Sequence, residues 1–316
     1  MTDGRLHYSF SPVAACNMCG AAPDRFRMMG MRLNRSQGFN PRAAAGIAVA
    51  VKRCRDCDLV FTDPQPLPAD FAEHYGHPDD YWESGYFDAD PAYFAQEIAE
   101  AKALLPYAPG MRALDIGAGI GKAMQALQAA GFETFGIEPG AEFRDVALKR
   151  GVPAEWLVLG GVEEAQFPDQ HFDFITFGAV LEHLQSPSQS IERALNWLKP
   201  NGIIQLEVPS AAHLVPRLVN LFFTLRGTNY VTNTSPMHPP YHLFEFGLRS
   251  FQRHGARAGY AIARHRYSVC DIFHLPRITH PILRWYMART DTGMQLTAYL
   301  RKAERSAAEG KEEKPE

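Results

Sequence analysis

The sequence predicts an α/β fold in which a parallel sheet follows a small cysteine-bearing module. Two observations lead to this fold class. From Met111 onward, short apolar runs typical of strands alternate with helical patterns that end at glycine or proline, which is the rhythm of crossover units on a parallel sheet. Before residue 62 lie two C-x-x-C pairs, which set the N-terminal part of the chain apart from this alternation.

The alternating region yields a definite order of elements. Strands are expected at 112–116, 133–138, 156–159, 172–177 and 202–208. Helices are expected at 93–105, 122–130, 141–150, 188–198 and 248–258. The strand-like segments 260–267 and 294–301 follow with no clear amphipathic helix of standard length between them, which suggests a final antiparallel pair.

Composition excludes several classes of protein. The chain has 316 residues, 46% of them hydrophobic, and its 32 Lys and Arg against 35 Asp and Glu give a net charge of -3. Because no basic excess is present, nucleic acid is not an expected partner. No signal peptide or membrane-spanning apolar stretch is visible. We therefore expect a soluble, cytoplasmic protein.

A glycine-rich turn carries the clearest chemistry. Leu114-Asp115-Ile116-Gly117-Ala118-Gly119-Ile120-Gly121 runs from a buried strand into a helix, and glycines there let a ligand lie against main-chain N–H groups. Glu138 closes the next strand, where a carboxylate can accept both ribose hydroxyls of an adenosine. The alternative is a plain strand-to-helix turn, which the position of Glu138 disfavours.

The spacing of this turn discriminates between adenosine cofactors. Dinucleotide sites favour G-x-G-x-x-G, whereas this turn reads G-x-G-x-G with Asp115 two residues before the first glycine. A pyrophosphate prefers a helix N-terminus without a nearby acid. A sulfonium ligand carries positive charge, so Asp115 would suit it.

Four ordered motifs together resemble class I S-adenosylmethionine-dependent methyltransferases. They are the glycine turn, Gly136-Ile137-Glu138, Phe167-Pro168-Asp169-Gln170-His171-Phe172-Asp173-Phe174-Ile175 and Val180-Leu181-Glu182-His183-Leu184. The similarity is to a bacterial branch and covers about residues 93–303. It implies a Rossmann-like seven-stranded methyltransferase sheet whose last strand is antiparallel, and S-adenosyl-L-methionine as the methyl donor.

The resemblance also implies roles for individual residues. The loop would hold the methionine end of the donor, Glu138 the ribose, and the segment 161–163 the adenine. Many relatives place Asp near Gly161, so the adenine contact here would fall to the backbone of Val162 and to Glu163. The complete set of expected donor-binding residues is Asp115, Gly117, Gly119, Gly121, Glu138, Val162, Glu163, Gly178 and Ala179.

The paired cysteines predict a structural metal site. Cys16, Cys19, Cys54 and Cys57 supply four thiolates in two tight turns, which suits tetrahedral Zn²⁺ with a closed coordination shell. Strands at 47–51 and 59–61 would complete a zinc ribbon. Iron in a rubredoxin-like site and unrelated free cysteines are the alternatives. The module is similar to that of zinc-bearing sugar and small-molecule methyltransferases.

These patterns divide the chain into a zinc-ribbon-like module (1–62), a connector rich in proline and aromatic residues (63–92), a methyltransferase domain (93–303) and a charged tail (304–316). Inserts at about 210–241 and 271–293 are expected to line the acceptor site, and a membrane-surface helix is the rival interpretation of the first. In the connector, Tyr81, Trp82 and Tyr86 would fold over the donor or simply pack.

Acceptor chemistry points to two histidines. His183 and His242 are the candidate catalytic bases, with Glu182 and Glu207 as weaker candidates and a hydrogen-bonded structural histidine as the alternative. The predicted function is methyl transfer to an O, N or C atom of a small molecule, such as a sugar or sugar-nucleotide. A nucleic-acid or protein methyltransferase that binds through its zinc ribbon, and a dinucleotide-dependent oxidoreductase, are the competing hypotheses.

Overall fold

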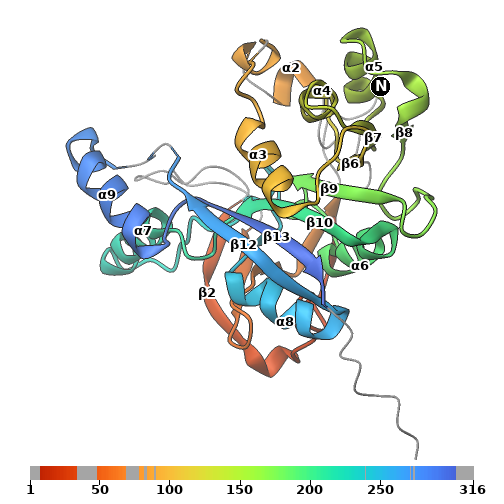
Figure 1. Ribbon diagram of the computed structural model, residues 1–316. Coiled ribbons are helices and arrows are strands. Elements are labelled where there is room, and N and C mark those ends of the chain that lie inside the picture. The colour runs from red at the N-terminus through yellow and green to blue at the C-terminus, as the bar shows by residue number, and fades with distance from the viewer. Residues whose placement is uncertain are drawn as a thin grey trace, which may run out of the picture.

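A seven-stranded sheet forms the centre of the computed structural model (Figure 1). The structure describes residues 8–33, 48–68, 78–81, 84–88, 90–238, 240–270, 272 and 275–303. The strand order is β12-β13-β10-β9-β6-β7-β8. Their bounds are β6 Arg112–Ile116, β7 Glu133–Glu138, β8 Leu157–Leu159, β9 Phe172–Gly178, β10 Leu198–Pro209, β12 Tyr260–Ser268 and β13 Gln295–Lys302.

The direction of the strands confirms the predicted fold class. β6 pairs in parallel with β7 and β9, and β9 pairs in parallel with β10. Only β13 runs antiparallel, to both β10 and β12. A parallel sheet closed by one antiparallel strand is therefore the frame on which the site is built.

Helices cover both faces of this sheet, as successive side chains of each strand require. On one face α3 (Ala95–Leu104) and α4 (Lys122–Ala129) pack on Phe174 and Ile203. On the other, α6 (Pro187–Trp197) and α8 (Leu248–Ala258) pack on the neighbouring Ile175 and Ile204. α5 (Ala141–Lys149) contacts β7 and β8 near the loop that follows β6.

The cysteine-bearing part of the chain builds two further sheets. A four-stranded sheet has the order β11-β4-β3-β2, and β1 pairs with β5 in a second. The bounds are β1 Tyr8–Ser11, β2 Phe26–Leu33, β3 Ala48–Cys54, β4 Val60–Asp63, β5 Gln65–Pro68 and β11 Phe244–Glu245. β11 belongs to the methyltransferase region, where it lies between β10 and α8 in the chain. The two parts therefore share one sheet. In the described part of the connector, β5 is followed by two short helical pieces, α2 Pro78–Tyr81 and η2 Ser84–Phe87.

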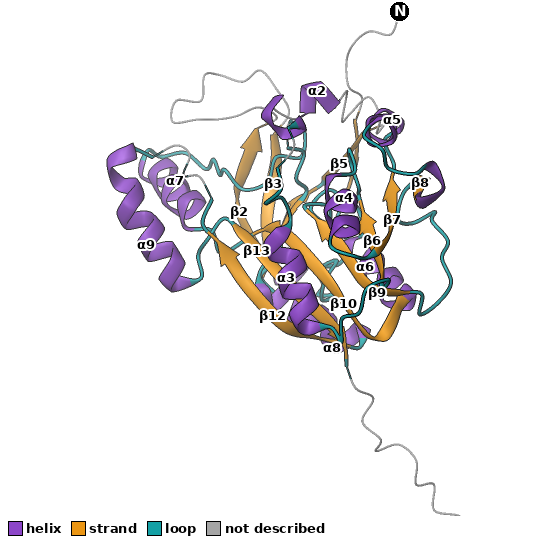
Figure 2. Ribbon diagram, turned by 45° about the horizontal axis from the view of Figure 1, so that its top comes forward, coloured by secondary structure: helices purple, strands orange, loops and turns teal. Residues whose placement is uncertain are grey.

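Two helices project together from one end of the central sheet (Figures 1 and 2). α7 (Leu214–Leu225) occupies the amphipathic run of the first insert. α9 (His280–Thr290), preceded by the short helix η4 (Arg277–Thr279), lies in the second. The expectation of no standard helix there was wrong. Apolar residues occur on more than one side of α9, which hides the single stripe that an amphipathic helix shows.

Among the described residues, every helix is too short or too polar to cross a lipid bilayer.

Candidate active site and cysteine cluster

The loop between β6 and α4 depends on its glycines. Gly117, Gly119 and Gly121 have φ angles of 75°, 54° and 80°, in the left-handed region that side chains disfavour. A Cβ on Gly117 would lie 2.5 Å from Cγ2 of Val180, and one on Gly121 would lie 2.6 Å from Cγ2 of Val152. Conformation and close packing together exclude side chains at Gly117 and Gly121. The side chains of Ala118 and Ile120 are buried, so the exposed surface of the loop is mainly main chain.

Glu138 joins this loop to the end of β7. Its carboxylate accepts hydrogen bonds from the backbone N–H of Gly119 at 2.7 Å and of Gly140 at 2.8 Å. Burial raises the pKa of Glu138 to about 7, against the lowering effect of those two hydrogen bonds. Each carboxylate oxygen can accept more than one hydrogen bond, so the group can position the loop and still bind hydroxyls.

Asp115 is buried directly before the loop. Its burial, and secondly the charge of Glu138, raise the pKa of Asp115 to about 8. A carboxyl that is this poorly solvated gains from a nearby cation. The site is therefore suited to a ligand that carries positive charge.

The connector covers the start of α4. The Nζ of Lys122 lies 4.6 Å from the ring centroid of Tyr86 and 4.5 Å from that of Tyr93, and it donates to the Tyr86 carbonyl at 2.9 Å. The two tyrosine hydroxyls are 3.2 Å apart. Tyr93 was not among the expected site residues, although it lies at the predicted start of a helix beside the donor loop. The side chain of Tyr81, and Trp82, lie outside the described residues.

The remaining donor-side residues lie at neighbouring strand ends. After β8, the side chain of Val162 is buried in the core whereas Glu163 is exposed, and Gly160 donates its N–H to the Glu138 carbonyl at 3.0 Å. At the end of β9, Gly178 and Ala179 are exposed, and no atom of the described residues lies within 4 Å of a Cβ built on Gly178. In parallel sheets these carboxyl ends meet at one edge.

The structure brings the two predicted histidines together. The rings of His183 and His242 lie 5.0 Å apart at 77° to one another. Glu182 Oε1 is 3.7 Å from His242 Nε2, and the N–H of Leu243 donates to the Glu182 carbonyl at 2.8 Å. That backbone contact holds residues from two distant segments beside the end of β9.

The surroundings of His242 keep its ring uncharged. Burial, then the neighbouring His183 and His238, lower the pKa of His242 well below its usual value. Burial raises the pKa of Glu182 to about 8, and its Oε2 accepts no hydrogen bond from the part of the chain that is described. Ligand atoms of Glu182, His183 and His242 lie within 4.8 Å of one another, so this group can hold a proton or a metal ion.

Glu207, the other weaker candidate, lies near the end of β10. Its backbone carbonyl, at the end of β10, accepts the N–H of Ala179 at 3.0 Å. Burial, followed by the charge of Glu97, raises the pKa of Glu207, while Arg266 lowers it. Glu207 thus lies near the ion pairs of β12 and α3, and its charge also helps to raise the pKa of Glu182, although Glu207 is not among the residues whose ligand atoms cluster with the two histidines.

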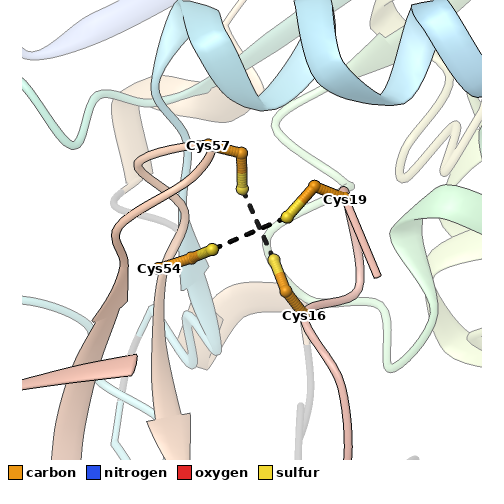
Figure 3. Close-up of side chains that lie close together, drawn as sticks. All are labelled: Cys16, Cys19, Cys54 and Cys57. Atoms are coloured by element: carbon orange, nitrogen blue, oxygen red, sulfur yellow. Dashed lines mark hydrogen bonds between the residues drawn. The ribbon is translucent and has the colours of Figure 1, made fainter. Parts of the chain in front are cut away.

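Four sulfur atoms converge on one point in the cysteine cluster (Figure 3). Cys16 Sγ lies 3.4 Å from Cys57 Sγ, and Cys19 Sγ lies 3.6 Å from Cys54 Sγ. Tetrahedral zinc with Zn–S bonds of about 2.3 Å places its sulfurs about 3.8 Å apart. The donor set and the spacing thus fit a four-cysteine metal site.

The cysteine cluster packs against the helices α6 and α8, which cover one face of the central sheet. The Ser250 hydroxyl on α8 donates to the Cys57 carbonyl at 2.8 Å, and the Ser188 N–H near the start of α6 donates to Asn17 Oδ1 at 2.8 Å. Cys54 shares its apolar core with Phe244 and Phe246. The cysteine cluster therefore also supports the segment that carries His242.

A parallel sheet with one antiparallel strand, a glycine-rich loop after its first strand and a carboxylate at the end of the second define a class I S-adenosylmethionine-dependent methyltransferase. This chain belongs to that class: the family model described as "Methyltransferase domain" matches residues 90–265.

Relatives resemble parts of the chain. An uncharacterized protein of Methanocaldococcus jannaschii is 31% identical over 134 residues, which are 42% of this chain and 57% of that protein. The ubiquinone biosynthesis O-methyltransferase of Photobacterium profundum is 28% identical over 97 residues, 29% of this chain and 41% of that enzyme. The chain thus spans about half the length of these curated relatives.

Solved structures are similar at a lower level. An S-adenosylmethionine-dependent methyltransferase from Mesorhizobium loti has a TM-score of 0.46 and 15% identity, over 68% of this chain and 99% of that one. One from Archaeoglobus fulgidus has a TM-score of 0.47 and 14% identity, over 69% of this chain and 96% of that one.

Proposed function

We propose that the chain transfers the methyl group of S-adenosylmethionine to an O, N or C atom of a small molecule, with a sugar or sugar-nucleotide as the first acceptor class to test. The observation that carries this proposal is the pair of hydrogen bonds from Gly119 and Gly140 to Glu138. They hold a carboxylate against a glycine-rich loop whose main chain is open to a ligand, which is the arrangement that an adenosyl group requires.

The donor would lie along the carboxyl edge of the sheet. Asp115 and the main chain of Gly117, Gly119 and Gly121 would contact its methionine end, and Glu138 its ribose. The backbone of Val162, with Glu163, would border the adenine, and Gly178 and Ala179 the amino-acid moiety. The exposed main chain at residues 178–179 and the buried side chain of Val162 are compatible with these roles.

His183 and His242 would act on the acceptor. A neutral imidazole can accept the proton that an attacking hydroxyl or amine loses, and burial keeps His242 neutral. The sulfonium is already a good leaving group, so alignment of the two reactants supplies much of the rate. The two histidines are therefore proposed to orient and deprotonate the acceptor.

Similarity to ubiquinone biosynthesis O-methyltransferases supports a small-molecule acceptor, and the net charge of -3 disfavours nucleic acid. The four cysteines are proposed to hold structural Zn²⁺. Their contacts with α6 and α8 favour a supporting role over that of a separate binding module.

Calorimetric titration tests the donor assignment. S-adenosylhomocysteine should bind with micromolar or tighter affinity, while NAD should not bind. If the protein bound NAD more tightly than S-adenosylhomocysteine, the dinucleotide-dependent oxidoreductase hypothesis would be favoured instead. With donor binding established, transfer of a labelled methyl group into sugar-nucleotide pools, compared with nucleic-acid and protein pools, identifies the acceptor class. Label in nucleic acid alone would overturn the small-molecule assignment.

A further inference from the structure

α7 and α9 pack on one another at the far end of the central sheet (Figures 1 and 2). Val215, Val219 and Phe223 of α7 share a buried cluster with Ile272 and Met287. One apolar stripe on each helix is thus already covered by the other helix and its surroundings.

Each helix carries a second apolar stripe that faces solvent. On α7, Leu218, Leu221, Phe222 and Leu225 follow helical spacing, and Leu225 is 78% exposed. On η4 and α9 the stripe consists of Ile278, Ile282, Trp285 and Tyr286, with Ile278 at 89% and Ile282 at 66%. These eight residues, the α7–α9 patch, are most of the 12 exposed large apolar side chains in the described part of the chain. Patches of this kind mark interaction sites.

The two helical segments that carry the patch contain basic but no acidic side chains. The segments 214–226 and 277–290 contain no Asp or Glu, although the whole chain has a net charge of -3. Their arginines include Arg289, whose guanidinium lies 4.8 Å from the centroid of the Trp285 ring. The arginines of the two segments are Arg217, Arg226, Arg277, Arg284 and Arg289.

We propose that the α7–α9 patch docks the protein on the surface of an anionic lipid bilayer. Leucine, isoleucine and tryptophan side chains would enter the boundary between headgroups and acyl chains, and the arginines would meet lipid phosphates. A second copy of this chain is the less suitable occupant, because a twofold contact would bring the same arginine-rich surfaces together.

The position of the patch gives this docking a consequence for function. β12 ends at Ser268 and β10 at Pro209, and both are in register with Gln295 at the start of β13. α7 and α9 therefore leave the sheet at the carboxyl edge of β10, the edge that also carries the donor loop. A docked chain would hold this edge close to the bilayer. This inference stands independently of the proposed methyl transfer.

Sedimentation of the full chain with vesicles tests the proposal. Vesicles containing phosphatidylglycerol should bind the protein more tightly than vesicles of phosphatidylcholine alone, and salt should weaken the binding. Leu225→Ser with Ile282→Ser, and separately Arg226→Glu with Arg277→Glu, should each lower the vesicle affinity by roughly tenfold or more. The matched control is Phe10→Ser with Met28→Ser, two side chains 39% and 48% exposed on other elements, which should leave binding unchanged.

Thermal unfolding confirms that each variant is folded. No binding to anionic vesicles would overturn the proposal, and so would equal loss in the control variant. A dimer in solution that the patch variants dissociate, without vesicle binding, would assign the patch to a second copy instead.

Discussion

The donor side and the acceptor side of this site are built in different ways. The proposed donor side comes from one strand–loop–helix–strand unit, and it offers the donor main chain and two buried carboxyls, Asp115 and Glu138. The acceptor side joins Glu182 and His183 to His242 across a long insert, and it relies on side chains. A donor that is the same in every reaction requires a fixed backbone geometry. The acceptor needs mainly to be oriented for attack on the methyl group.

Loss of metal should have the largest effect and should fall first on the acceptor side, because the cluster supports the segment of His242. Chelation, or Cys54→Ser, is expected to lower the melting temperature sharply, since structural zinc sites contribute roughly 10 kcal/mol or more to folding in small domains. Metal analysis with thermal unfolding measures this. Cys270→Ser, outside the cluster, is the control, and a metal-free protein with unchanged melting would contradict the assignment.

Replacing His242 should separate chemistry from donor binding. His242→Ala is expected to lower the transfer rate by roughly 10²–10⁴-fold, the range for a lost general base, and to leave the affinity for S-adenosylhomocysteine unchanged. Rates and calorimetry on the same variant measure both. His213→Gln changes a half-buried histidine just before α7 and should have little effect on either quantity. An equal loss of rate in that variant would reduce His242 to a structural role.

Glu138→Gln, unlike His242→Ala, should weaken donor binding. We expect a loss of about 1–3 kcal/mol in S-adenosylhomocysteine affinity, the scale for hydrogen bonds to a charged group. Glu133→Gln, at the start of the same strand and paired with Arg112 on the surface, serves as the control. Unchanged affinity in Glu138→Gln would show that the ribose lies elsewhere.

Two glycines with similar φ angles distinguish strain from site geometry. Gly117 (φ 75°) touches Val180, whereas Gly110 (φ 86°) has no atom within 4 Å of a built Cβ. Alanine at either position should cost about 1–2 kcal/mol of stability through the left-handed conformation, and Gly117→Ala should cost more because its Cβ would lie 2.5 Å from Cγ2 of Val180. Only Gly117→Ala should also weaken donor binding, as measured by calorimetry. If both variants bind the donor with equal affinity, the loop does not contact the donor.

Donor affinity should rise with pH in a way that reports on Asp115. Its pKa of about 8 in the free protein means that binding a cationic ligand releases a proton. Affinity should therefore increase by up to about tenfold per unit as pH approaches 8 and level off above it. Asp115→Asn should flatten the profile.

The same raised pKa has a consequence for stability. The folded state binds this proton more tightly than the unfolded chain, whose carboxyl has the ordinary value of 3.8. The contribution of Asp115 to the free energy of unfolding should thus be intact below about pH 4 and fall as pH rises towards 8. A wild-type melting profile matching that of Asp115→Asn would contradict this.

The sequence predicted the strands of the proposed donor side closely, and the arrangement of the proposed acceptor side only in part. β6 and β7 begin and end at the predicted residues because buried strands bounded by glycine are local signals. The pairing of His183 with His242 depends on how the 210–241 insert folds, which local patterns do not encode. α9 escaped prediction because its exposed apolar stripe obscures the periodicity, and Tyr93 because a helix start gives no sign of contact with Lys122.

A crystal structure grown with S-adenosylhomocysteine tests the central claim most directly. The adenosyl group should lie over residues 117–121, with both ribose hydroxyls donating to the Glu138 carboxylate and the ammonium group near Asp115. Density for the ligand at any other place, or a loop closed by protein side chains, would contradict the account.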